Sequence, residues 1–469
     1  MKKNDKQNFD LLAQNKKFWK NRDNYYNREL RRSYSYIVPE DSIILELGCA
    51  GGDLLNSLKP ARGVGIDIST NMLQYARKRN PELEYIEGDV EQISEPNETF
   101  EYVIGADLVG HLDDIYGFLN NIKRFCNSDT RVIFSFYNNI WLPIVKMGEI
   151  LGLKSKTRIQ HWVSINDMDN LLRICGYKLI NKDKFMLIPV YIPLIGYFIN
   201  RFIAPLPLIK NFCLVQSVIA RKITGEKKDY TCSIIVPSVN EKGNIEELVN
   251  RMPKFGSDME IIFVDGGSTD GTIEEIERMI TEHPEKDISL IHQGGFLGKN
   301  DAVRKGFIKS KGEILFIEDS DITVDPETLT EFYEIISSGR GEFINGSRLV
   351  YALDQKAMRF LNILGNMVFS AIFTYLLNQK IKDTLCGTKV IFKRHWEEVN
   401  KSREYFGDFD PFGDFELLFG AAKLNLDIVE LPVKYRARKY GDIKIQRFRH
   451  GLMLLKMAFI GFIKLKVNT

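Results

Sequence analysis

The sequence has few cysteines and almost no net charge, and both shortages narrow what the protein can be. Its 6 cysteines among 469 residues stand singly, with no Cys-x-x-Cys pair. We therefore expect small buried thiols in a reducing compartment and no disulfide framework. Lys and Arg number 64 against 62 Asp and Glu, a net charge of +2. No overall positive field points to a nucleic-acid partner, and none is expected.

Long apolar runs are lacking as well. The N-terminal stretch MKKNDKQNFD contains no apolar core, so the sequence predicts no secretory signal. The uncharged run FMLIPVYIPLIGYFIN (185–200) is broken by two prolines and is shorter than the roughly 20 residues that span a bilayer. Lys456 and Lys464 interrupt the apolar C-terminal run. We expect both runs to lie at a membrane surface; core helices or a domain interface are the alternative.

A basic run lies beside the second apolar segment. Residues 434–449 hold seven Lys and Arg and a single acid, Asp442. Such a run would attract the anionic lipid of a membrane surface. The sequence therefore predicts a cytoplasmic protein that is peripherally associated with the inner face of the membrane.

The length of 469 residues exceeds what one hydrophobic core usually serves, so two domains are expected. Seven candidate strands alternate with amphipathic helices between residues 42 and 220, and five more follow from residue 232. This alternation predicts two α/β domains with parallel sheets and helices on both faces. The predicted division is 1–221 (core 42–221, apolar insert 185–210), a polar linker at 222–229, a second domain at 230–446 and an amphipathic helix at 447–469.

A glycine-rich turn marks the first candidate site. In IILELGCAGGDLL (43–55) an apolar strand ends at Glu46, and Gly48, Gly51 and Gly52 lead into a helix. Glycines at such a place let the backbone adopt positive φ and approach a ligand closely. Nucleotide ligands bind at the carboxyl ends of strands in sheets of this kind.

Acids end the next two strands of the first half. Asp67 closes GVGID, where a carboxylate can accept both hydroxyls of a ribose, and Asp89 lies in EGDV, where an adenosine edge could lie. ELGCAGG followed by these two motifs resembles the class I S-adenosylmethionine-dependent methyltransferases over about residues 25–221. The resemblance implies S-adenosylmethionine as cofactor, with Asp67 at the ribose and Asp89 at the adenine. The other residues it implies to bind the cofactor are Glu46, Gly48, Gly51 and Gly52; ordinary turn chemistry is the alternative.

The methyl acceptor cannot be identified from the sequence. His111, in ADLVGHLDD, follows the fourth strand near the expected mouth of the site. A general base is one interpretation, and a hydrogen-bonded structural histidine is the favoured one. The apolar insert at 185–210 precedes the last strand of this half, where it could meet a lipid-linked acceptor.

Three strands of the second half also lead into polar or acidic residues. They stop at Pro237 in SIIVPSVNE, at Asp265 in EIIFVDGGSTDGT, and before Asp319 and Asp321 in LFIEDSD. Like charges at this spacing repel unless something positive lies between them. An Asp-x-Asp pair at a strand end suits Mg²⁺ or Mn²⁺, with a diphosphate filling much of the remaining octahedron.

These motifs resemble the family 2 glycosyltransferases of the GT-A fold, and most closely the polyisoprenyl-phosphate glycosyl synthases, over roughly residues 231–450. The resemblance implies that Asp319 and Asp321 bind metal, that Pro237 and Glu241 contact the nucleoside, and that Asp265 lies near the base. The sequence departs from the family pattern at Gly266, Asn300 and Ile443. The residues implied to bind substrate are Pro237, Glu241, Asp265, Lys299, Ser320, Arg348 and Asp383.

Basic motifs complete the second resemblance. Arg348, in NGSRLV, is implied to face the acceptor phosphate, and Arg438 and Lys444, in YRARKYGDIK, are implied to steady the departing diphosphate. Asp414 and Glu416, in GDFELL, lie where related enzymes keep a catalytic carboxylate. Capping of a helix start is an equally good interpretation of both acids.

The sequence as a whole predicts a bifunctional enzyme. Its second half would transfer a sugar, with metal and with inversion at C1, from a nucleotide sugar to a polyisoprenyl phosphate, and its first half would transfer a methyl group. One alternative is a glycosyltransferase that acts on a polysaccharide or glycolipid chain. Another is a first half that only binds S-adenosylmethionine or docks. Neither the sugar, the nucleotide base nor the oligomeric state can be predicted.

Overall fold

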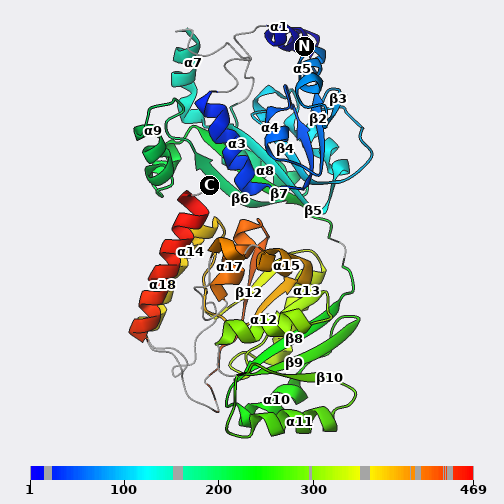
Figure 1. Cartoon of the computed structure of the whole chain (residues 1–469), viewed down its shortest axis with the longest axis vertical. Coiled ribbons are helices and arrows are strands. Elements are labelled where there is room, and N and C mark those ends of the chain that lie inside the picture. Colours follow the sequence, from blue (N-terminus) through cyan, green and yellow to red (C-terminus); the bar gives the residue numbers. More distant parts are fainter. Residues whose placement is uncertain are drawn as a thin grey trace. The chain divides into compact units, whose positions relative to one another are not determined.

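The computed structural model divides the chain into two compact units. Unit 1 comprises Met1–Thr224 with Lys466–Thr469, and unit 2 comprises Gly225–Leu465. Figure 1 shows the helices and strands of each unit, many of them labelled. The residues that the structure describes are 2–14, 24–150, 162–225, 227–294, 298–348, 360–401, 403–406, 414–436, 438, 440 and 447–467.

Unit 1 is built on a sheet of seven strands, counted over its described residues, in the order β3-β2-β1-β4-β5-β7-β6. Neighbours from β3 to β5 are parallel, whereas β7 runs antiparallel to β5 and β6. All seven strands were predicted, but the expectation of purely parallel pairing is wrong for β7. The strands are β1 (Ile43–Leu47), β2 (Arg62–Asp67), β3 (Glu84–Glu87), β4 (Phe100–Ala106), β5 (Cys126–Tyr137), β6 (Tyr177–Phe185) and β7 (Val215–Lys222).

The helices of unit 1 begin at caps that are visible in the sequence. The Ser69 side chain accepts the Met72 N–H at the start of α5 (Thr70–Arg79), and Ser164 forms a capping box at the start of α8 (Ile165–Ile174). The other helices are α1 (Lys2–Gln14), α3 (Tyr25–Ile37), α4 (Asp53–Ser57), α6 (Ile115–Asn121), α7 (Leu142–Ile150) and α9 (Ile195–Phe198). All six cysteines of the chain are buried and free, as the sequence predicted.

Unit 2 has its own seven-stranded sheet, counted over its described residues, in the order β10-β9-β8-β11-β13-β12-β14. Here β13 runs antiparallel to both β11 and β12, which again departs from the expected parallel sheet. The strands are β8 (Thr231–Ser238), β9 (Asp258–Asp265), β10 (Asp287–His292), β11 (Ile314–Ile317), β12 (Phe343–Ser347), β13 (Lys389–Phe392) and β14 (Ile428–Pro432). The helices are α10 (Lys242–Arg251), α11 (Thr272–Glu282), α12 (Lys299–Lys309), α13 (Leu329–Ser337), α14 (Phe360–Leu377), α15 (Lys393–Lys401), α16 (Arg403–Phe406), α17 (Asp414–Lys423) and α18 (Arg447–Phe462).

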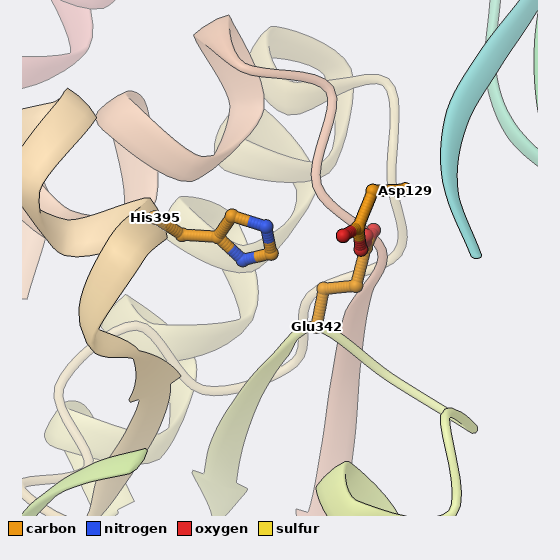
Figure 2. Close-up of side chains that lie close together, drawn as sticks. All are labelled: Asp129, Glu342 and His395. Carbon is orange, nitrogen blue, oxygen red and sulfur yellow. The ribbon is translucent and has the colours of Figure 1, made fainter. Parts of the chain in front are cut away.

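The two strands that the sequence did not predict are β12 and β13. Glu342 stands just before β12 and accepts the backbone N–H of Asp427 at 2.9 Å, while His395 lies on α15, which follows β13 (Figure 2). Asp129, also labelled in Figure 2, belongs to unit 1. The strands β12 and β13 were not predicted because both are short and fully buried. They therefore lack the alternation of polar and apolar residues that marks a half-exposed strand.

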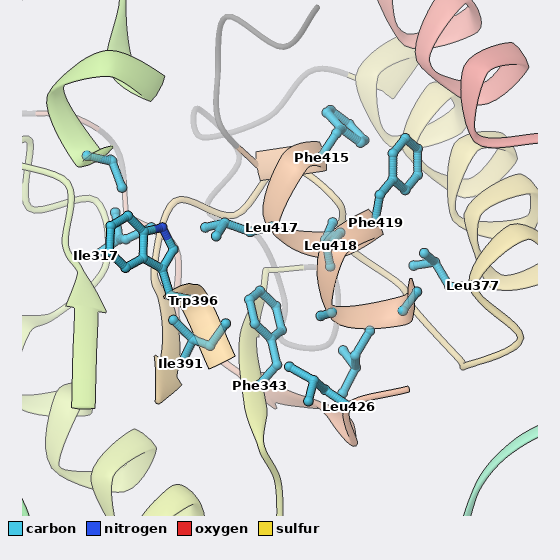
Figure 3. Close-up of a cluster of buried hydrophobic side chains, with 14 of the residues drawn as sticks. Ile317, Phe343, Leu377, Ile391, Trp396, Phe415, Leu417, Leu418, Phe419 and Leu426 are labelled. Atoms are coloured by element: carbon cyan, nitrogen blue, oxygen red, sulfur yellow. The ribbon is translucent and has the colours of Figure 1, made fainter. Parts of the chain in front are cut away.

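One face of the second sheet is covered by aromatic side chains from the helices. Phe415 and Phe419 of α17 and Trp396 of α15 pack with Ile317 of β11 and Phe343 of β12 in a buried cluster (Figure 3). Because the interior is close-packed, this cluster fixes the strands whose carboxyl ends carry the acids discussed below.

Both apolar runs contain helical residues, but the first is only partly helical. Residues 185–200 include α9, and the C-terminal run is mostly α18. No helix within the described part of the chain is both long and apolar enough to cross a bilayer.

Removing the charge of Lys423, at the end of α17, is expected to stabilise the protein near neutral pH. Burial lowers the pKa of Lys423 from 10.5 to about 8. Between these two values the unfolded chain binds more protons than the folded one, so stability rises with pH across that window. Lys423→Met should raise the unfolding temperature at pH 7 by about 3 °C and remove this part of the pH dependence. Scanning calorimetry at pH 7 and 10 measures both. Lys309→Met, at an exposed position on α12, is the control and should leave the pH dependence as in the wild type.

Candidate functional site

The glycine turn of unit 1 connects β1 to α4 in a conformation that favours glycine. Gly48 and Gly52 have φ of +72° and +71°, and Gly52 is the N-cap residue of α4. The Gly48 N–H donates to the carbonyl of Ile66 at 2.8 Å, which ties the turn to the end of β2. A Cβ atom at Gly52 would lie 2.3 Å from the Tyr85 hydroxyl, so no larger residue fits without movement.

The acids of unit 1 hold the loops at the same edge of the sheet. Asp67 accepts the N–H of Ala50 at 2.8 Å and of Ser69 at 2.9 Å, so it joins the glycine turn to the loop after β2. Asp89, in the loop after β3, accepts the N–H of Glu91 at 3.0 Å. Both carboxylates are therefore oriented by backbone groups.

Four of the six predicted cofactor residues line a single cavity of about 300 Å³. They are Glu46, Gly48, Asp67 and Asp89. Gly51 and Gly52 form the adjoining turn but are not among the lining residues. Glu46 is buried and accepts the N–H of Leu55 at 3.1 Å, which fixes the start of α4 against β1.

Helix α1 adds a wall to this cavity that the sequence did not predict. Phe9 and Leu12 line the cavity from α1. Asp10 of the same helix accepts the Ser69 hydroxyl at 2.6 Å and the N–H of Asn71 at 3.1 Å, and these bonds hold α1 at the start of α5 (Figure 1). Only the short apolar spacing in α1 could have indicated its role, and many surface helices share that spacing.

His111 lines the cavity as well, at the end of a short 3-10 turn (Val109–His111). Its ring meets the Phe9 ring edge-on, with centroids 5.9 Å apart. This packing accords with the structural role that the sequence favoured, and the general-base role stays a prediction.

In unit 2, three parallel strands bring their carboxyl ends to one edge. The strands β9, β8 and β11 are neighbours, and they end at Asp265, Ser238 and Ile317. The Ser320 hydroxyl donates to the carbonyl of Pro237 at 3.1 Å, so the loop after β11 rests on the end of β8. Asp265 accepts the N–H of Gly267 at 2.8 Å and shapes its own loop.

Asp319 is held by a lysine and enclosed by a glycine. The Lys299 ammonium, from the start of α12, lies 2.5 Å from an Asp319 oxygen. Burial alone would raise the pKa of Asp319, but Lys299 outweighs it and holds that pKa below its usual value. A Cβ atom at Gly387 would lie 1.8 Å from the other Asp319 oxygen, so only glycine leaves room for the carboxylate.

Asp321 shares an arginine with Glu241. The Arg438 guanidinium donates to one Asp321 oxygen and lies 3.7 Å from the buried Glu241. The other Asp321 oxygen accepts the Thr323 hydroxyl at 2.7 Å. This arginine therefore connects a predicted metal ligand to a predicted nucleoside contact.

Arg348 and Asp383 form a buried pair. Nε of Arg348 donates to Asp383 at 2.6 Å and an NH2 group donates to its second oxygen at 2.8 Å, a planar two-point contact. The Arg348 guanidinium also lies over the Tyr435 ring, 5.1 Å from its centroid. Asp383 therefore orients the arginine that was expected to face the acceptor phosphate.

Asp414 begins α17 and pairs with Lys389 at 2.7 Å. Sequence reasoning missed Lys389, which starts β13, lies opposite Ile317 of β11 and is 1% exposed. It missed Glu318 too, whose pKa burial and the charge of Asp319 raise well above the usual value. Glu416 accepts a hydrogen bond from Asn300 at 2.9 Å, and Lys444 lies outside the described residues.

The residues at this edge fit a divalent cation. Asp319 and Asp321 supply carboxylate oxygens, the ligands that Mg²⁺ and Mn²⁺ prefer. Lys299 and Arg438 lie against these carboxylates, and the Asp319 carboxylate occupies the position beside Gly387 that a larger residue would fill. The edge of unit 1 fits S-adenosylmethionine in the same sense, because a glycine turn and two oriented acids line one cavity.

Two family models match the chain. A methyltransferase domain matches residues 44–129, and glycosyl transferase family 2 matches residues 233–399. Both resemblances seen in the sequence are thereby confirmed, and so is the predicted class of two α/β domains.

Named relatives match the second half. A dolichol-phosphate mannosyltransferase of Saccharomyces cerevisiae is 36% identical over 22% of this chain and 39% of its own length. A dolichyl-phosphate beta-glucosyltransferase of Trichomonas vaginalis is 28% identical over 53% of this chain and 74% of its own. A dolichol-phosphate mannosyltransferase of Pyrococcus furiosus is 32% identical over 48% and 63%. The chain thus spans less than two thirds of the first and third of these relatives.

Among solved structures, glucosyl-3-phosphoglycerate synthase from Mycobacterium tuberculosis, in complex with Mn²⁺ and uridine diphosphate, aligns with 50% of this chain and 80% of its own. The identity is 17% and the TM-score 0.37. At this similarity the alignment supports no argument about the site.

Proposed function

We propose that this chain, which carries a methyltransferase domain at 44–129 and a family 2 glycosyltransferase domain at 233–399, is a bifunctional transferase. Unit 2 transfers a sugar from a nucleotide sugar to a polyisoprenyl phosphate, with a divalent cation. Unit 1 transfers a methyl group from S-adenosylmethionine to an acceptor of unknown identity.

One observation carries the glycosyltransferase proposal. Asp319 and Asp321 lie at the carboxyl edge of three parallel strands, and Lys299 and Arg438 contact them there. Acids and bases that meet at such an edge suit a metal-bound diphosphate. The names of the relatives support a dolichyl phosphate as acceptor, but they include both mannosyl and glucosyl enzymes, so the sugar stays open.

Different residues of unit 2 would bind the nucleoside, the cation and the diphosphate of the donor. Pro237, Glu241 and the Asp265 loop hold the nucleoside, and Asp319 and Asp321 hold the cation. The cation, when bound, stabilises the charge that develops on the departing nucleoside diphosphate. Lys299 and Arg438, which pair with the two acids, would also contact that diphosphate.

The reaction requires that the acceptor phosphate be oriented, and it does not require a strong base. A phosphate oxygen is anionic near neutral pH, so it attacks C1 of the sugar without losing a proton to the protein. Arg348, fixed by Asp383, orients this phosphate. Attack from the face opposite the leaving group inverts C1, as the family resemblance implies.

A donor panel tests the glycosyltransferase proposal. Labelled guanosine and uridine diphosphate sugars are incubated with a short-chain isoprenyl phosphate, with Mn²⁺ or with chelator, and lipid-extractable label is counted. Product that requires both a donor and Mn²⁺ supports the proposal. Transfer to an oligosaccharide in place of the lipid phosphate would favour the alternative, a polysaccharide-type enzyme.

The methyltransferase proposal rests on the cavity at the edge of the first sheet. The Gly48 turn, Asp67 and Asp89 line it from three neighbouring strands. Calorimetric titration with S-adenosylhomocysteine tests it. Heat of binding that disappears in Asp67→Asn supports the proposal, whereas no heat in the wild type favours a unit that only docks.

We also propose that unit 1 lies on a membrane surface. An apolar patch, exposed in the structure, comprises Val190, Tyr191, Leu194, Ile195, Tyr197, Phe198, Phe202, Leu206, Leu208 and Phe212. Leu194 and Leu208 are 86% and 81% exposed, and Arg201 and Lys210 lie in the same segment. Exposed apolar side chains gathered in one segment are typical of interfacial binding to a membrane.

Charging this patch is expected to release the protein from lipid. The double variant Leu194→Glu and Leu208→Glu should lower binding to vesicles that contain phosphatidylglycerol by about tenfold or more, because each buried leucine contributes about 2 kcal/mol. Sedimentation with the vesicles measures the bound fraction. Ile174→Glu is the matched control, since Ile174 is 57% exposed on α8 outside the patch. An unchanged bound fraction in the double variant would refute membrane docking through this surface.

A further inference from the structure

The cavity of unit 1 contains an acid that the proposed cofactor contacts do not use. In the order β3, β2, β1, β4 across the sheet, Asp89 and Asp67 follow the first two strands and Gly48 follows the third. Asp107 follows the fourth, directly after the last residue of β4, and it lines the same cavity. It therefore lies beyond the glycine turn, on the side away from the two acids assigned to the nucleoside.

Strand register places Asp107 beside the glycine turn. Glu46 of β1 pairs with Ile104 of β4, so two residues further on Gly48 is level with the end of β4. A Cβ atom at Gly48 would lie 3.0 Å from the Leu108 side chain, which confirms this closeness. Asp107 therefore lies next to the turn on which the methionine part of the proposed cofactor would rest.

Asp107 is held firmly in an uncommon conformation. Its φ is +53°, in the left-handed region that few non-glycine residues adopt. Its N–H donates to the carbonyl of Ser135 on β5 at 3.0 Å. The Tyr26 hydroxyl of α3 donates to an Asp107 oxygen at 2.7 Å, and Tyr34, two turns along, donates to the Ser135 hydroxyl at 3.1 Å.

The phenol beside Asp107 stays a donor. Burial and then the charge of Asp107 raise the pKa of Tyr26 well above its usual value. Tyr26 therefore keeps its proton at neutral pH. Its hydroxyl donates to one oxygen of the Asp107 carboxylate and so fixes the orientation of that carboxylate. Such an arrangement leaves Asp107 as the group that can gain a proton.

The charge of the cavity limits which acceptor enters. Its acidic lining residues are Glu46, Asp53, Asp67, Asp89, Glu91, Asp107 and Asp113, while the basic ones are Arg31 and His111. A carboxylate or phosphate acceptor would meet more acidic than basic lining residues, which opposes its binding. A neutral hydroxyl meets no such penalty, but it must lose its proton when it is methylated.

We propose that Asp107 is the proton acceptor for methylation of a neutral hydroxyl group and that Tyr26 is its positioning residue. The inference rests on the proposed S-adenosylmethionine site. The hydroxyl oxygen forms a bond to the methyl carbon, the bond from that carbon to sulfur breaks, and its electron pair stays on sulfur. The hydroxyl proton passes to the Asp107 carboxylate and then to water.

Sinefungin tests this without knowledge of the acceptor. It matches S-adenosylhomocysteine except that a carbon bearing an ammonium group replaces the sulfur, so its ammonium lies where the methyl group would be. The full-length protein should bind sinefungin more tightly than S-adenosylhomocysteine. Asp107→Asn should weaken sinefungin by at least about tenfold and change S-adenosylhomocysteine by less than about threefold.

Two further variants sharpen the result. Tyr26→Phe should weaken sinefungin in the same selective way by a smaller factor, and it decides the question if Asp107→Asn does not fold. Glu82→Gln removes an exposed acid of unit 1 that does not line the cavity; it is the control and should change neither affinity. Equal weakening of both ligands by Asp107→Asn would overturn the proposal and assign Asp107 to the methionine ammonium instead. If the wild type binds neither ligand, the proposed methyltransferase function itself fails.

Discussion

Sugar transfer is expected to fall by about a thousandfold or more when Asp321 is replaced by alanine, and by a similar factor when Asp319 is. Each substitution removes one carboxylate from the proposed cation site and one acidic partner of a basic side chain, Arg438 in the first case and Lys299 in the second. The measurement is the initial rate of lipid-linked product at saturating donor and Mn²⁺.

Isosteric and distant variants separate charge from folding. Asp321→Asn keeps the shape of the side chain, including a group for Thr323 to donate to, and should lose nearly as much activity as Asp321→Ala. Asp287→Asn removes an acid at the opposite end of the sheet, where β10 begins, and should be close to the wild type. Metal-dependent transfer at the wild-type rate by Asp321→Ala would refute the metal role of this residue.

The second large effect is expected from a single methyl group. Gly387→Ala places a Cβ atom 1.8 Å from an Asp319 oxygen, a distance at which one of the two must move. Asp319 cannot shift without disturbing its 2.5 Å contact with Lys299. We therefore expect transfer to fall by about a hundredfold and the protein to lose about 1–3 kcal/mol of stability.

Two comparisons show whether the Gly387 effect is local. Binding of S-adenosylhomocysteine, which belongs to unit 1, should not change in Gly387→Ala. Gly148→Ala, at a position with no atom within 4 Å of the added Cβ, should retain full transfer activity. If Gly387→Ala transfers sugar at the wild-type rate, the enclosure of Asp319 is not needed for the reaction.

Much of the candidate site could be predicted because it depends on local pattern. Asp67 in unit 1 and Asp265 and Asp319 in unit 2 each come at the end of an apolar run. Within each sheet, parallel neighbouring strands have their carboxyl ends at the same edge. The positive φ of Gly48 and Gly52 could be expected for the same reason, since a sharp turn follows β1 directly. Such features need only the sequence on either side of a strand end.

What the sequence did not predict depends on tertiary pairing. Lys389 looks like the start of an ordinary apolar segment, and it meets Asp414 only because β13 runs antiparallel to β11. Phe9 of α1 reaches the cavity only because Asp10 is bonded to the start of α5. The left-handed Asp107 has no sequence signature, because Ser135 and Tyr26 hold it from distant parts of the chain.

The central claim is that Asp319 and Asp321 join a divalent cation to the phosphates of a nucleotide. Electron paramagnetic resonance titration of Mn²⁺, with and without guanosine or uridine diphosphate, tests it most directly. The account predicts that nucleotide tightens Mn²⁺ binding, that Mn²⁺ tightens nucleotide binding by the same factor, and that Asp321→Ala abolishes both effects. Nucleotide binding that is equally tight with and without Mn²⁺ would contradict it.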